Sequence, residues 1–428
     1  MNAPVFTPYQ KFVIAMLAFL QFTLVLDFMI MSPLGALLMP DLHISTRQFG
    51  LVVSAYAFSA GAAGIMAAGF ADKFDRKRLL LFFYAGFVLG TFLCGIANTY
   101  AFLLAARIVT GLFGGVIGSV SMAIIADLFP MQVRGRVMGF VQTAFAASQV
   151  LGLPLGLFLS NRWNWHAPFL MIVGVSAVVG ILIAFKLKPI NEHLKIPSTR
   201  NPFVHLYKTV SQGRYIQGFA ATMLLATGGF MLMPFGSAFS VGNLGISMQQ
   251  LPWVYLGTGI ASFIAGPFMG KLSDKLGKYK MFSIGSTLGI AVVLLYCNLG
   301  ITPLAWVIVV NIVLFTAVTA RMIASQSLMS GVPDMPDRGA FMAVNNSVAQ
   351  FAGGVAASIA GLIVVQTPNG HMEHYGVLGW VVAGAMAATI LLMYPIHKMV
   401  TQKMASQGGQ PAGPGAGSGV PQPAAAAK

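Results

Sequence analysis

Three charged residues stand inside long apolar stretches of the 428-residue sequence. Asp27, Arg107 and Arg321 each have mostly apolar residues on either side. A charge at the centre of a bilayer costs at least about 2.5–3.5 kcal/mol on insertion scales, so such a residue normally faces a cavity or has a partner. These side chains are therefore the first candidates for function, and the chemistry open to them is the binding of protons or of charged groups.

Asp27 is the deepest carboxylate in the sequence. It lies about 15 residues into its apolar stretch, which is roughly 22 Å along a helix axis. Desolvation and a nearby guanidinium move the pKa of a carboxylate in opposite directions, so a carboxylate under both influences can exchange a proton. One interpretation is that Asp27 takes up and releases protons while its contact with Arg107 changes. The other is a fixed Asp27–Arg107 ion pair that only holds the first and fourth apolar segments together.

Arg321 has no acidic residue at its depth in the sequence. It either contacts an anionic group of a bound compound, or it snorkels or bonds to helix carbonyls. Gln142, Asn346 and Gln350 are further candidates for lining a cavity, because Gln142 aligns with Asn346 across an internal repeat and because Asn346 and Gln350 share a helix face. The alternative for these polar side chains is hydrogen bonding between helices.

The composition places these residues in a membrane. Hydrophobic residues make up 57% of the chain and charged residues only 8%, whereas about 25% of an average soluble domain is charged. A helix needs about 20 apolar residues to cross a bilayer, and twelve stretches meet this requirement. We expect an all-α membrane protein with spans at residues 12–39, 48–70, 79–98, 101–127, 136–160, 165–186, 215–241, 249–270, 280–299, 303–331, 339–366 and 376–397.

The two sets of six spans repeat each other at an offset of 202–204 residues. The matching pairs are Asp72 and Asp274, Arg76 and Lys278, and Arg134 and Arg338. Parallel repeats of six spans predict two pseudo-symmetric halves with a binding site between them. The predicted boundaries are 1–187 for the N-terminal half, 188–214 for a linker, 215–399 for the C-terminal half and 400–428 for a disordered Gly/Pro/Ala-rich tail.

Lys and Arg residues collect on one side of the predicted spans and explain the formal net charge of +15. Apart from Arg107 and Arg321 within spans, only Arg47 and Arg162 fall on the side opposite to the termini. Cytoplasmic loops carry the excess of Lys and Arg in membrane proteins. Both termini are therefore expected in the cytoplasm, and the positive charge does not require nucleic acid.

Charges that occur in both halves are expected to serve a task that both halves share. A carboxylate at a helix end can cap the helix or pair with a nearby Arg when that side of the protein closes. The alternative is a set of solvated loop charges that only sets orientation. We expect a cytoplasmic gate that contains Asp72, Arg76, Arg134, Asp274, Lys278 and Arg338.

Two connectors resemble motif A of the major facilitator superfamily, G-x-x-x-D-R-x-G-R-K. Residues 68–78 keep the Asp and the basic cluster but lack both glycines, whereas residues 270–280 keep both. Arg107-Ile-Val-Thr-Gly111 resembles motif B, R-x-x-x-G. The resemblance covers residues 10–400 and implies the major facilitator fold. With Asp27 in the first span, the chain looks most like bacterial proton-linked drug and small-molecule efflux members.

This resemblance implies a secondary active transporter of small amphipathic or apolar compounds that works by alternating access across the bacterial inner membrane, as proton-coupled efflux. An importer or facilitator of a small solute and a lipid transporter are the alternatives. The sequence has no phosphate-binding loop of the P-loop type, no catalytic cluster and no metal-ligand spacing,. We expect no enzyme, no metal and no cofactor besides the proton gradient. The expected partners are a small-molecule substrate and the lipid bilayer, and the expected state is a monomer.

Overall fold

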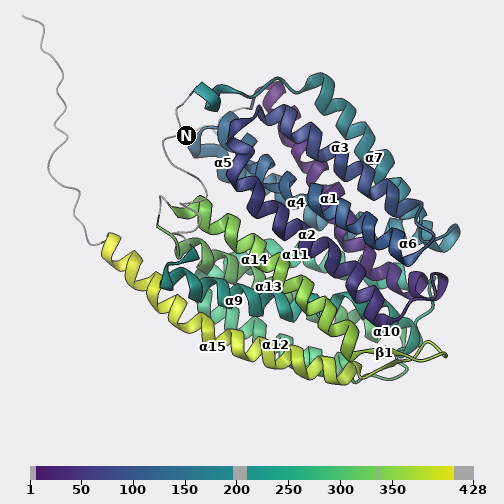
Figure 1. Cartoon of the computed structure of the whole chain (residues 1–428). Coiled ribbons are helices and arrows are strands. Elements are labelled where there is room, and N and C mark those ends of the chain that lie inside the picture. The colour runs from purple at the N-terminus through teal and green to yellow at the C-terminus, as the bar shows by residue number, and fades with distance from the viewer. Residues whose placement is uncertain (1–5, 196–209, 335–336, 409–428) are drawn as a thin grey trace, which may run out of the picture.

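Twelve helical segments dominate the computed structural model, which describes residues 6–195, 210–334 and 337–408. Each of the twelve is long and apolar enough to cross a membrane, which confirms the expected all-α architecture. Figure 1 shows these segments packed side by side in one bundle. Part of the predicted linker, 196–209, and the end of the predicted tail, 409–428, lie outside the described residues.

The two halves contribute six spans each. The first six are α1 (Pro8–Asp41), α2 (Thr46–Phe70), α3 (Arg76–Gly95), α4 (Tyr100–Leu128), α5 (Met131–Ala147) continued by α6 (Leu153–Arg162), and α7 (Ala167–Lys186). The second six are α9 (Gly213–Phe230) continued by α10 (Gly236–Gly242), α11 (Leu251–Leu276), α12 (Lys278–Cys297), α13 (Leu304–Gly331), α14 (Arg338–Ile363) and α15 (Tyr375–Gly408). A short hairpin of β1 (Val365–Gln366) and β2 (Met372–Glu373) joins α14 to α15.

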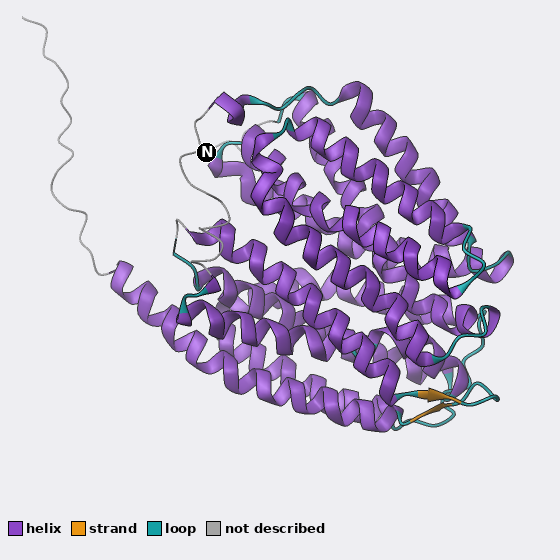
Figure 2. Ribbon diagram, in the orientation of Figure 1, coloured by secondary structure: helices purple, strands orange, loops and turns teal. Residues whose placement is uncertain are grey.

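Both ends of the described chain lie on the same side of the bundle, which follows from an even number of spans. We call this side the termini face; it holds the start of α1 and the end of α15 (Figure 1). The opposite side is called the far face, and it holds the β1–β2 hairpin, drawn in orange in Figure 2.

Local sequence signals explain where several spans begin. Thr7 and Ser45 precede α1 and α2, and each forms a reciprocal capping box with the Gln three residues later. Asp75 caps α3 by accepting a hydrogen bond from the backbone N–H of Arg78. Such caps satisfy N–H groups that the first turn of a helix leaves without intrahelical partners.

Two spans are interrupted, which the hydropathy pattern did not predict. The fifth span contains a π-helical turn over Ser148–Gly152, directly before Pro154 in the first turn of α6. The seventh contains a 3-10 turn over Met233–Phe235, which includes Pro234. Proline lacks a backbone N–H and its ring clashes with the preceding turn, so a helix adjusts locally beside it.

The halves are hydrogen-bonded to each other near the far face. Ser32 on α1 accepts from Ser237 on α10 at 2.8 Å, and Thr46 on α2 donates to the carbonyl of Val364 after α14 at 2.6 Å. Asn161 at the end of α6 donates to the carbonyl of Met248 before α11 at 2.8 Å. Among the described residues, every hydrogen bond between the halves lies in the part of the bundle nearer the far face.

The observed ends of two spans differ from the predicted ones. The span predicted over 339–366 ends at Ile363, because Val365 and Gln366 pair with β2 instead. The last helix continues to Gly408, past the boundary predicted at 399 for the disordered tail. Its final turns are held by Lys403, which donates to the carbonyl oxygens of Gly331, Val332 and Pro333 at the end of α13.

Candidate functional site

Asp27 and Arg107 form an ion pair inside the N-terminal half. Arg107 Nη1 on α4 donates to Asp27 Oδ2 on α1 at 2.8 Å, and the two side chains are 1% and 0% exposed. Thr91 on α3 donates from its hydroxyl to the other carboxylate oxygen, Asp27 Oδ1, at 3.0 Å. Three helices thus hold one buried acid, and the sequence-predicted pair is brought together. Its role in proton exchange remains a prediction.

Glycines on α4 let α2 approach the arginine side of this pair. A Cβ atom on Gly111 would lie 2.5 Å from the carbonyl oxygen of Tyr56, and one on Gly115 would lie 2.3 Å from that of Ala60. This close packing places the ring of Tyr56 against Arg107, with the guanidinium carbon 4.5 Å from the ring centroid. The aromatic face thereby stabilises the cation, while Arg107 Nε has no hydrogen-bond partner in the described structure.

An aromatic contact links this site to the other half. The ring of Tyr56 packs on Phe28 of α1 with centroids 5.4 Å apart. Phe28 in turn packs on Phe230, the last residue of α9, at 5.6 Å. Phe28 and Phe230 are themselves equivalent positions of the repeat. The buried ion pair is therefore separated from the interface between the halves by only two aromatic side chains.

Arg321 lies within the C-terminal half, on α13. Its side chain is 2% exposed, and its guanidinium carbon is 5.9 Å from the ring centroid of Phe282 on α12. Gly228 on α9 faces it, because a Cβ there would lie 3.1 Å from Arg321 Nη1. The Nε and Nη2 atoms have no hydrogen-bond partner among the described residues. One alternative from the sequence was that Arg321 bonds to helix carbonyls, and these two atoms form no such hydrogen bond in the described structure.

The other predicted cavity residues lie on helices of both halves. Gln142 on α5 and Asn346 on α14 are exposed, and Gln350 is half-buried one turn beyond Asn346. The neighbouring Asn345 is buried and accepts a hydrogen bond from the Thr222 hydroxyl of α9 at 2.7 Å. Asn345 is therefore used for hydrogen bonding between helices. The exposed side chains of Gln142 and Asn346 are available for the predicted contact with a ligand.

At the termini face of the N-terminal half, Arg76 pairs with Asp127 at 3.1 Å. Arg134 donates to the carbonyl oxygens of Phe129 and Ala126, at the end of α4. A cation at this end of a helix is favoured by the exposed carbonyls and by the helix dipole. Asp127 was not among the predicted gate residues, because its partner lies on another helix and no local spacing indicates it. The side chain of the predicted gate residue Asp72 lies outside the described part.

The C-terminal half builds its termini face differently. Asp274 is exposed and has no hydrogen-bond or ion-pair partner among the described residues, and Lys278 is half-buried. Asp334 instead pairs with Arg214 and with Lys403, the latter at 2.9 Å. The Lys403 hydrogen bond is the main reason that the pKa of Asp334 lies below its usual range. The side chain of Arg338 lies outside the described part.

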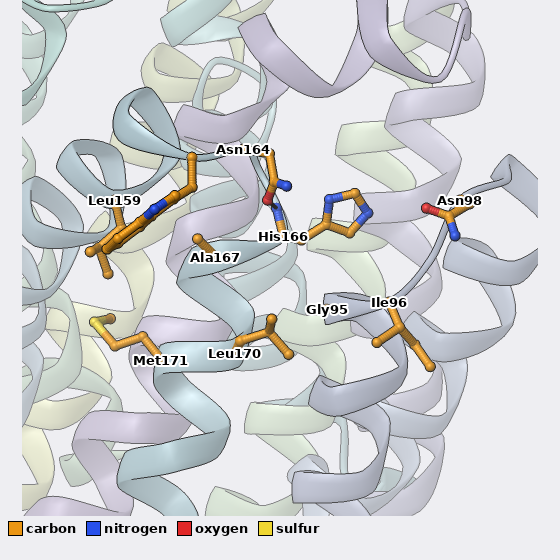
Figure 3. Close-up of a pocket in the computed structure, with 10 residues that line it drawn as sticks. Gly95, Ile96, Asn98, Leu159, Asn164, His166, Ala167, Leu170 and Met171 are labelled. Atoms are coloured by element: carbon orange, nitrogen blue, oxygen red, sulfur yellow. Dashed lines mark hydrogen bonds between the residues drawn. The ribbon is translucent and has the colours of Figure 1, made fainter.

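Two hollows lie at the far face. One of about 870 Å³ is bounded by the ends of α3 and α6 and the start of α7, all in the N-terminal half, with Asn98, Asn164 and His166 as its polar lining (Figure 3). The other, of about 630 Å³, contains His371 and Glu373. No group of three or more His, Cys, Asp or Glu side chains in the described ranges is arranged to hold a metal ion.

Comparison with known proteins identifies a family that this chain matches. The sequence model of the Major Facilitator Superfamily matches residues 17–357 and 218–417. The uncharacterized MFS-type transporter YceJ of Bacillus subtilis (strain 168) is 29% identical over 381 residues, which are 88% of this chain and 93% of that protein. Multidrug resistance protein 3 of the same organism is 33% identical over 151 residues, 35% of this chain and 30% of that protein.

Solved structures support the same fold. A bacterial homolog to the human lysosomal transporter Spinster, in its inward-facing and unoccupied conformation, superposes with a TM-score of 0.69 at 15% sequence identity. The match covers 94% of this chain and 99% of that one. The occupied inward-facing form of the same homolog gives a TM-score of 0.65.

Proposed function

Because the chain belongs to the Major Facilitator Superfamily, whose members are transporters and not enzymes, we propose that it is a proton-coupled exporter. In this proposal it moves small amphipathic compounds out of the cytoplasm across a bacterial inner membrane and works as a monomer. The termini face is the cytoplasmic one, in line with the excess of Lys and Arg there. The partial likeness to a multidrug resistance protein supports the substrate class.

The observation that carries the proposal is the isolation of the Asp27–Arg107 pair from solvent. A proton added to Asp27 alone would leave Arg107 charged and buried, and loss of one partner from a buried pair costs about 3–5 kcal/mol. Protonation is therefore favourable only when Arg107 gains another partner or reaches water. Proton binding and rearrangement of α1 against α4 are linked by this requirement, which is what coupled transport needs.

The aromatic contacts supply a route by which the rearrangement reaches the other half. Movement of Arg107 changes its contact with the ring of Tyr56. Tyr56 packs on Phe28, and Phe28 packs on Phe230 of the other half. Separation of Phe28 from Phe230 is required before the halves can part at the far face. In the proposed cycle, the protonation state of Asp27 sets the free energy of this separation.

The hydrogen bonds between the halves support an assignment to one step of the cycle. They lie near the far face, so this conformation is the one closed to the outside. In this proposal the exposed residues Gln142 and Asn346 contact a compound that enters from the cytoplasm. In the opposite state, the charges at the termini face, including Arg76, Arg134, Asp274 and Lys278, take part in closing the cytoplasmic side.

Membrane vesicles of both orientations test the direction. Inside-out vesicles that contain the protein should accumulate a fluorescent amphipathic dye when an acid-inside pH gradient is imposed, and an uncoupler should abolish the accumulation. Accumulation in right-side-out vesicles under an acid-outside gradient, with none in inside-out vesicles under the acid-inside gradient, would support a proton-coupled importer and overturn export. Equilibration in both kinds of vesicle without accumulation would indicate a facilitator.

A further inference from the structure

The guanidinium of Arg321 is a buried cation without a protein counter-ion. It is 2% exposed, and two of its three nitrogens, Nε and Nη2, lack hydrogen-bond partners within the described residues. Removal of a cation from water is costly unless an anion or several acceptors replace the lost hydration. A residue kept in this state indicates that a partner from outside the chain completes the site.

The acidic residues of the chain cannot provide that partner. There are ten, and Asp27, the one in the middle of a span, is already paired with Arg107. The other nine stand at span ends or in connectors, namely Asp41, Asp72, Asp75, Asp127, Glu192, Asp274, Asp334, Asp337 and Glu373. Arg321 is well inside α13, away from all of these positions along the helices.

Two apolar side chains, Phe282 and Met386, stand beside the guanidinium of Arg321. Phe282 presents a ring to the guanidinium, and both Met386 of α15 and the Nη1 atom of Arg321 lie within 4 Å of the point where a Cβ on Gly228 would stand. A side chain at residue 228 would crowd Nη1, so the glycine keeps α9 clear of the cation. A cation in an apolar wall matches a molecule that carries one anionic group on an apolar body.

We propose that Arg321 binds the oxyanion, a carboxylate or a phosphate, of an amphipathic compound that the protein transports. This inference rests on the proposed transport function and narrows its substrates to organic anions. Gly228, next to the guanidinium, is two residues before Phe230, which contacts Phe28 of the other half. A bound anion would therefore neutralise a charge beside the contact that has to open during transport.

Ligand-induced stabilisation of the full chain in detergent tests the proposal. The probes are decanoate, decyl phosphate, decanol and decylammonium at equal concentrations below micelle formation. The two anions should raise the thermal midpoint of the wild-type protein, and the alcohol and the amine should not. Arg321→Gln should lose this response and Arg321→Lys should keep part of it. Arg162→Gln, at an exposed far-face position, is the matched control and should respond like wild type.

Three results would overturn the assignment. The first is an unchanged response to the anions in Arg321→Gln. The second is a sharp fall of the ligand-free midpoint in Arg321→Gln, because removal of an uncompensated charge should leave the midpoint unchanged or higher. The third is stabilisation by phosphatidylglycerol alone, which would assign the site to a lipid phosphate. The assay uses no proton gradient, so its outcome is independent of whether transport is proton-coupled.

Discussion

The two halves of the molecule follow one plan of six spans, yet they bury charge in opposite ways. In the N-terminal half, Arg107 is paired with Asp27 and the site is neutral. In the C-terminal half, the position equivalent to Asp27 is Gly229, and Arg321 is left without an acid. We expect residues that both halves share to serve the common fold, and these unshared charges to be available for a specific task.

The difference indicates a division of labour. In a neutral ion pair the carboxylate can take up a proton in place of its contact with the arginine, so the N-terminal site is suited to proton binding. A buried cation without a protein counter-ion can be neutralised by an anion, so the C-terminal site is suited to an anionic ligand.

The largest contrast is expected between two arginine substitutions. Arg107→Met leaves Asp27 charged and buried and should lower the free energy of unfolding by about 3–5 kcal/mol. Arg321→Met removes a charge that has no partner and should cost nothing or stabilise the protein. Chemical unfolding in mixed micelles measures both. Equal losses in the two variants would contradict the comparison.

A double substitution sharpens the first result. Asp27→Leu combined with Arg107→Met removes both charges at once, so its unfolding free energy should be higher than that of Arg107→Met alone. Additive losses would mean that the pair does not act as a unit.

The halves also differ in how closely their second and fourth spans pack. Gly115 of α4 touches the backbone of α2, whereas the equivalent position of the C-terminal half is Thr319. Gly115→Ala should cost about 1–3 kcal/mol through overpacking. Gly118→Ala is the matched control, because a Cβ there has no atom within 4 Å. The same unfolding assay applies, and equal stability of the two variants would show that α2 and α4 separate easily.

Contacts between the halves should set the population of the far-face-closed state. The Ser54 hydroxyl accepts from Ser358 of the other half, and its own proton can go to the carbonyl of Gly354 at 2.7 Å or to that of Gly50, in its own helix, at 2.6 Å. Ser54→Ala should weaken closure by about 0.5–1.5 kcal/mol, a shift of roughly twofold to tenfold. Spin labels at exposed residues 162 and 373, one in each half, report the far-face distance. Ser160→Ala, whose hydroxyl bonds only within its own helix, should leave the distribution unchanged.

The smallest effect is expected at the termini face of the C-terminal half. Lys403→Met breaks a partly exposed ion pair with Asp334 and should cost about 0.2–1 kcal/mol. The pKa of Asp334 is lowered in the folded state, so this contribution is present above the ordinary carboxyl pKa and is lost as pH falls through the lowered value. The difference between wild type and Lys403→Met should thus stay constant from pH 5 to 8. A difference that disappears within that range would contradict the assignment.

The spans and their repeat could be predicted because they depend on run length and order along the chain. Twelve apolar stretches of about 20 residues specify twelve helices, since the strands of a closed barrel, the other way to satisfy the backbone in lipid, need only about 9–11 residues. The depth of Asp27 also follows from its place in its stretch. That Arg107 is its partner was a hypothesis from the sequence, and the structure places the two 2.8 Å apart.

Features that depend on which helix faces meet could not be predicted. The Arg76–Asp127 pair and the Asp334–Lys403 pair join residues far apart in the sequence, with no local spacing to indicate them. The seventh span is interrupted at Pro234, although the residues around it are apolar enough to form one continuous helix. The contact between Phe28 and Phe230 exists only because the repeat brings equivalent faces of α1 and α9 together.

The most direct test of proton coupling through Asp27 uses proteoliposomes loaded with a pH-sensitive dye. Cationic, neutral and anionic amphipathic compounds are added to wild type, to Asp27→Asn and to the control Asp41→Asn, whose acid accepts a hydrogen bond from Trp165 at the far face. Proton movement opposite to that of a transported compound is expected in wild type and in Asp41→Asn, and none in Asp27→Asn. Equal proton movement in Asp27→Asn, or transport by wild type without proton movement, would contradict proton coupling through Asp27.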